Sequence, residues 1–149
     1  MNMVIKTLTH YDKVEQFVQQ QIKDMVGSRT VVVRATKSGY SIGNMDVING
    51  NTAWLLKDRT GKTLQEFRQR RIALLTAALL FTNKTSLAGE SRSLDTQYDM
   101  FLHDFMIYKQ RLEQDPDNMI MQDRFDRVKY ELETIKSRIM ELEKTANLQ

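Results

Sequence analysis

The chain of 149 residues contains no cysteine, one proline, one tryptophan and two histidines. Without thiols it can form neither a disulfide framework nor a thiolate metal site, and a cysteine nucleophile is excluded. A metal site in a helical bundle needs paired Glu-x-x-His motifs, and His10 and His103 do not supply them. No serine is spaced from a histidine and an acid as a nucleophile would require. These absences predict a protein that is not an enzyme and that holds no cofactor and no metal.

Long hydrophobic runs are also scarce. The longest, residues 72–81, would span about 15 Å as a helix, which is half of a bilayer crossing. Residues 1–16 lack an apolar segment behind a basic one, so no signal peptide is expected. We therefore predict a cytoplasmic protein without a membrane partner.

Charge is unevenly distributed. Residues 28–92 carry eleven Lys and Arg against four Asp and Glu, a net charge of +7, whereas residues 93–149 carry eight against twelve, a net charge of −4. A basic middle and an acidic end could bind anions or pair head to tail between copies, and solvated surface charge explains the same pattern.

Residues 1–82 are predicted to form a small α+β domain that opens with an amphipathic helix. Apolar side chains recur there every three or four positions from Tyr11 to Val26, between a cap at Thr9 and a stop at Gly27. From residue 30 the pattern becomes short and β-branched. We expect a meander of three antiparallel strands at 30–36, 40–48 and 52–58.

The second of these strands contains Gly43, which suggests a bulge or a close backbone approach. After the third comes the sequence Gly61-Lys62-Thr63, which invites comparison with a phosphate-binding loop. Such a loop needs glycine five residues earlier, and Leu56 stands there. We therefore interpret Thr63 and Glu66 as a capping box for a helix over 64–82, buried in its second half.

Residues 83–93 are rich in Ser, Gly and Asn without periodicity and are predicted to be a linker. Residues 94–149 then carry two apolar seams spaced alternately by four and three, which predict an antiparallel, coiled-coil-like helical hairpin. Pro116 ends the first helix, and Asp117 or Asn118 caps the second. The first seam is Leu94, Tyr98, Phe101, Phe105, Tyr108 and Leu112, and the second is Met121, Phe125, Val128, Leu132, Ile135, Ile139 and Leu142.

The first hairpin helix has apolar side chains outside its seam. This second apolar side must pack on the chain's own basic domain, on another copy or on a different protein. We expect a non-enzymatic structural or assembly protein whose partner is itself or other assembly proteins. The candidate interface residues are Leu102, Phe105, Met106, Ile107, Met121 and Phe125.

The alternative function is nucleic-acid binding through the basic residues of 29–71. Tyr40 and Trp54 would serve as stacking platforms for bases. No recognisable DNA- or RNA-reading motif is present, and the acidic hairpin would repel a phosphate chain. The candidate residues are Arg34, Lys37, Arg59, Lys62, Arg68, Arg70 and Arg71.

Two segments together resemble small uncharacterised proteins of contractile-tailed marine phages. They are "GYSIGNMDVINGNTAWLLKDRTGKTLQEFRQRRIALLTAALL" and "YDMFLHDFMIYKQRLEQ" with the heptad helix after it, covering residues 39–80 and 98–142. The resemblance implies a phage-encoded protein and a virion component located in the particle. It carries over no site residues.

Overall fold

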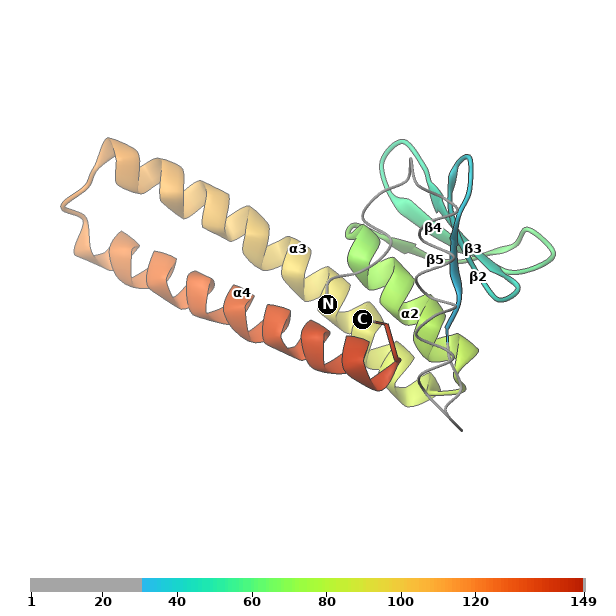
Figure 1. The fold of residues 1–149 in the computed structure, drawn as a ribbon. Helices are drawn as coiled ribbons and strands as arrows, with labels where there is room; N and C mark the ends of the chain where they lie inside the picture. Colours follow the sequence, from blue (N-terminus) through green and yellow to red (C-terminus); the bar gives the residue numbers. More distant parts are fainter. Residues whose placement is uncertain (1–30, 149) are drawn as a thin grey trace.

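The computed structural model describes residues 31–148, which form an α+β fold of an antiparallel sheet followed by helices (Figure 1). Five strands and three helices lie in this part of the chain. The strands are β1 (Val33–Ala35), β2 (Gly39–Ile42), β3 (Met45–Asn49), β4 (Trp54–Lys57) and β5 (Thr63–Phe67), and the helices are α2 (Arg70–Phe81), α3 (Thr85–Gln114) and α4 (Met119–Thr145). The helix predicted over residues 9–27 lies outside the described residues.

The sheet is a meander in which each strand pairs antiparallel with the next, in the order β1-β2-β3-β4-β5. The prediction of three strands is therefore wrong. The predicted strand 40–48 is two strands, because Gly43 and Asn44 form a turn between the paired residues Ile42 and Met45. Gly43 has φ +59°, which suits a two-residue hairpin turn. A Cβ on Gly43 would lie 2.5 Å from Cδ1 of Phe81, so the space beside this turn glycine is filled by a side chain, whereas the sequence suggested a bulge or a close backbone approach.

Gly61 and Lys62 belong to the turn between β4 and β5, and Thr63 is the first residue of β5. The Asp58 carboxylate accepts hydrogen bonds from the backbone N–H groups of Thr60 (2.9 Å) and Lys62 (3.0 Å), and Gly61 adopts φ +86°. The chain then continues as β5, which pairs along β4 from Lys57↔Thr63 to Trp54↔Phe67. The predicted capping box at Thr63 and helix start at Leu64 are thus wrong: these residues pair as a strand.

Helix α2 is buried along most of its length, as its apolar sequence predicts. It packs on strands β2 to β5 on one side and on α3 on the other. Side chains from the inner face of the sheet, including Tyr40, Val47 and Leu56, join those of α2 in one hydrophobic core. The helix starts at Arg70, later than the sequence predicts.

Residues 85–93, predicted as part of a linker, form the first turns of α3. The small residues that suggested a linker allow close packing here, since Ala88 and Ser91 are fully buried. The Ser91 hydroxyl lies 2.6 Å from the Thr76 hydroxyl of α2, so the two helices are joined by a buried polar contact. The division of the chain into domains at 82 and 94 stays a prediction.

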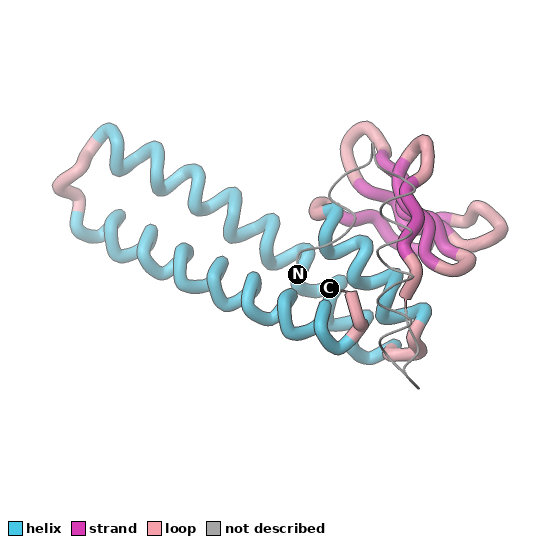
Figure 2. The backbone as a smooth tube through the Cα atoms, viewed as in Figure 1, coloured by secondary structure: helices cyan, strands magenta, loops and turns pink. Residues whose placement is uncertain are grey.

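Helices α3 and α4 form a long antiparallel hairpin that extends well beyond the sheet and α2 (Figures 1 and 2). Most of the predicted seam of α4 is buried against α3, and Asn118, one of the two predicted caps, accepts a hydrogen bond from the Met121 N–H at 3.0 Å. The hydrophobic core includes α3 up to Phe101 and α4 from Ile135 onward. We call residues 102–134 the distal arm, because they lie outside this core.

Candidate functional site

The distal arm is held together by its own seam. The rings of Phe105 and Phe125 stack with centroids 4.9 Å apart, and the Lys129 ammonium lies 5.4 Å from the Phe125 centroid. Met121, Val128 and Leu132 are buried between the two helices. The arm is therefore a two-helix structure with a closed inner seam, and any contact with another molecule must use its outer surface.

That outer surface carries apolar side chains. Met106 of α3 is 63% exposed, and Met119 and Ile120, at the start of α4, are 83% and 69% exposed. Tyr130 is also largely exposed. Sequence reasoning did not single out Met119 and Ile120, although both follow the Asp-Pro turn and precede the first seam residue of α4.

The six predicted interface residues do not form one surface. Phe105, Phe125 and Met121 lie in the seam between α3 and α4, where Met121 is buried and both rings are half-buried. Leu102 and Ile107 are half-buried. Met106 is the member of the set that is largely exposed to solvent.

At the base of the hairpin, two bidentate ion pairs join helices: one ties α4 to α2, and the other ties α4 to α3. Arg71 of α2 donates to both carboxylate oxygens of Glu143 at 2.7 and 2.6 Å, and hydrogen bonding to this carboxylate raises the pKa of Arg71. Arg138 of α4 donates to both oxygens of Glu90 on α3, at 2.8 Å for Nη2. This hydrogen bonding lowers the pKa of Glu90. The base from which the arm projects is thus joined to α2 by an ion pair, and its two helices are joined to each other by another.

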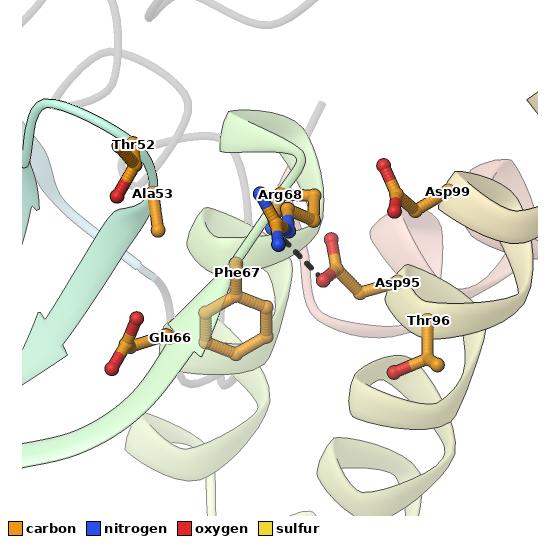
Figure 3. A pocket seen from close by; sticks show the side chains of 8 residues that line it. All are labelled: Thr52, Ala53, Glu66, Phe67, Arg68, Asp95, Thr96 and Asp99. Atoms are coloured by element: carbon orange, nitrogen blue, oxygen red, sulfur yellow. Dashed lines mark hydrogen bonds between the residues drawn. The ribbon is translucent and has the colours of Figure 1, made fainter. Parts of the chain in front are cut away.

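A pocket of about 360 Å³ lies where β5 leads into α2 (Figure 3). Asp95 is 5% exposed, and its two carboxylate oxygens accept the backbone N–H groups of Arg68 and Gln69, each at 2.9 Å. These groups lie at the start of α2, where the side chain of the N-cap residue Gln69 makes no capping hydrogen bond. Asp95 therefore supplies from α3 the acceptor that the start of α2 lacks. Burial raises the pKa of Asp95 in spite of these bonds.

The basic residues of the alternative function are divided between the two ends of the sheet. Successive turns of a meander lie at opposite ends, so Lys37, in the β1–β2 turn, is separated from Arg59 and Lys62 in the β4–β5 turn. The segment 68–71 follows β5 and returns to the end where Lys37 lies. Arg34 is exposed on β1. The predicted basic set is therefore not one continuous surface.

Two members of the basic set are engaged within the fold. Arg71 is paired with Glu143, and the Arg70 guanidinium lies 6.0 Å from the centroid of the Tyr40 ring. Tyr40 is fully buried, with its centroid 6.3 Å from that of the half-buried Trp54. A buried ring cannot stack on a base, so Tyr40 is not a stacking platform.

Among residues 31–148, no group of three His, Asp or Glu side chains is arranged to hold a metal ion. The helices of this same part of the chain include none with the length and hydrophobicity for a bilayer crossing. Comparisons with protein-family models, with curated proteins and with solved structures found no match.

Proposed function

We propose that this protein is a non-catalytic structural component that assembles with copies of itself through the distal arm. One observation carries the proposal: Met106, Met119 and Ile120 are exposed on an arm that lies outside the core and extends beyond the sheet and α2 (Figure 1). Exposed apolar side chains gathered on one projecting element are typical of protein contact sites. In an interface, a few well-packed residues supply most of the binding free energy.

The wider role that we propose is assembly of a virion. Its support is the resemblance of residues 39–80 and 98–142 to small proteins of contractile-tailed phages. A long rigid helical pair suits a role in which one subunit must reach its neighbour, since α3 alone is about 45 Å long.

The test is the molar mass in solution, measured by size exclusion with light scattering up to tens of micromolar protein. We expect the wild type to form oligomers whose mass rises with concentration. Replacing Met106, Met119 and Ile120 together by Gln should yield a monomer. The control Met140→Gln changes an exposed methionine at the base of α4, outside the arm, and should assemble like the wild type.

A wild type that stays monomeric throughout this range would contradict the proposal. So would a triple variant that assembles as the wild type does. Circular dichroism of each variant checks that helicity is unchanged, which is expected because all three positions are exposed.

A further inference from the structure

The body of the protein has an open depression of about 720 Å³ beside the C-terminal end of α2. Its apolar part is formed by Met45, Leu80 and Phe81, and Arg59 lies at its polar side. Its other lining residues are Gly43, Asn44 and Asn83. The volume is within the range of about 300–1,000 Å³ that is typical of small-molecule binding pockets.

The tip of the distal arm is complementary to this depression in shape and in charge. Met119 and Ile120 are among the most exposed apolar side chains of the described residues, and they stand immediately after a turn that contains Asp115 and Asp117. The tip is thus an apolar projection next to two carboxylates. The depression is an apolar hollow next to an arginine, with Lys62 in the same turn as Arg59.

One chain cannot join its own tip to its own depression. The hairpin turn lies at one extremity of the molecule and the sheet at the other (Figure 1). Helix α3 extends about 45 Å between them, its first turns pack on α2, and α4 beside it is ion-paired to α2. A second copy of the chain meets no such restriction.

We propose that the tip of the arm docks in this depression on a second copy of the chain, with Met119 and Ile120 against Leu80 and Phe81. Asp115 and Asp117 then face Arg59. This inference rests on the proposed function and names the surface that receives the arm. The contact joins two different patches, so it is heterologous and generates rings or open filaments.

Complementation between two variants tests this geometry. The tip variant Met119→Gln/Ile120→Gln keeps an intact depression, and the body variant Asn44→Glu/Arg59→Glu keeps an intact tip. All four positions are exposed, so both variants should fold. We expect each alone to be monomeric, with association weakened about tenfold or more. An equimolar mixture should form a one-to-one dimer and nothing larger, because each dimer has one working tip and one working depression.

Matched controls lie away from both surfaces. Lys37→Glu reverses a charge in the β1–β2 turn, at the opposite end of the sheet, and Met140→Gln changes the base of α4. Both should assemble as the wild type does. Asp115→Lys/Asp117→Lys should weaken assembly, and adding Arg59→Glu to the same chain should restore it, because opposite charges again face each other.

The failures of the two proposals differ. If the body variant assembles normally while the tip variant does not, or if the mixture stays monomeric, docking in the depression is overturned and assembly through the arm stands. A monomeric wild type overturns both.

Discussion

The carboxylate of Asp95 accepts hydrogen bonds at the start of α2, where the sequence of α2 itself supplies no side-chain cap. Helix α2 begins after Gln69, whose side chain makes no cap, and it has no acidic residue in its first turn. Asp95 provides both acceptors from α3, at the cost of being buried. One residue therefore fixes the start of one helix and the position of another.

Replacing Asp95 separates the hydrogen bonds from the charge. Asp95→Ala should lower the free energy of unfolding by about 2 kcal/mol at neutral pH, because two backbone N–H groups lose their acceptors. Asp95→Asn keeps an acceptor and should cost less. Urea unfolding of both variants measures the difference, and equal losses would show that hydrogen bonding is not what Asp95 contributes.

The charge of Asp95 has a predictable pH dependence. Burial raises its pKa in the folded protein, so the protonated form is favoured there relative to the unfolded chain, where aspartates titrate near about 3.9. Stability from this shift is present below about pH 3.9 and is lost as the pH rises through the folded pKa. Asn does not titrate. As the pH rises through the folded pKa of Asp95, the free energy of unfolding of Asp95→Asn should therefore increase relative to that of the wild type. Urea unfolding at several pH values measures this difference.

Gly89 is a residue that the fold does not require to be glycine. It is exposed within α3, and a Cβ added there would meet no atom within 4 Å. Gly89→Ala should raise the free energy of unfolding by about 0.5–1 kcal/mol, because alanine is the better helix former. Gly43→Ala is the contrasting variant and should destabilise, since its φ is positive and Phe81 is in the way. Thermal unfolding compares the two, and a destabilised Gly89→Ala would contradict the helical packing described here.

At the scale of elements, the hairpin base depends on ion pairs between helices. Glu143 is 6% exposed, and Arg71 of α2 compensates its charge. Arg71→Met should lower the free energy of unfolding by about 1–3 kcal/mol. This loss is smaller than for a fully buried ion pair, because Arg71 is itself half exposed. Arg71→Met/Glu143→Met should recover most of this loss, because it removes the uncompensated buried charge. A double-mutant cycle measures the coupling, and purely additive effects would contradict it.

The seam of the hairpin sets where a charge is tolerated. Ile135 is buried in the core, whereas Ser137, two residues further on the same helix, is exposed. Ile135→Asp should lower the free energy of unfolding by at least about 3 kcal/mol, because it buries an unpaired charge. Ser137→Asp should be within about 0.5 kcal/mol of wild type. Near-wild-type helicity and melting temperature for Ile135→Asp would contradict the seam.

At the scale of the whole molecule, the distal arm lies outside the hydrophobic core that the sheet shares with the helices. The hairpin residues of the core end at Phe101 and resume at Ile135. Removing equal numbers of whole heptads from the two helices of the arm should leave the sheet and α2 folded. The shortened chain should lose assembly, which light scattering measures, while the near-ultraviolet circular dichroism of Trp54, the one tryptophan in the sequence, stays unchanged. Loss of that signal would show that the sheet and α2 need the arm in order to fold.

The predictions that were confirmed and those that were wrong differ in the range of the interactions behind them. The buried helix and the seam of α4 follow from spacing within one segment. The pairing of Thr63–Phe67 with β4 and the packing of Ala88 and Ser91 on α2 depend on residues elsewhere in the chain. Thr63 followed by Glu66 satisfies the pattern of a helix cap, but strand pairing competes successfully for the same backbone groups. The same distinction holds for the predicted interface residues. Met106 is exposed, whereas Phe105 and Phe125 stack on each other in the seam between α3 and α4.

The sequence by itself determined the α+β class, the buried helix and the seam, because apolar periodicity is a local property of the chain. Only the tertiary structure decided that Asp95 holds α2, that Arg71 pairs with Glu143, and that Met119 and Ile120 stand at the end of a projecting arm. Those outcomes depend on which distant residues meet, and no spacing within a segment specifies that.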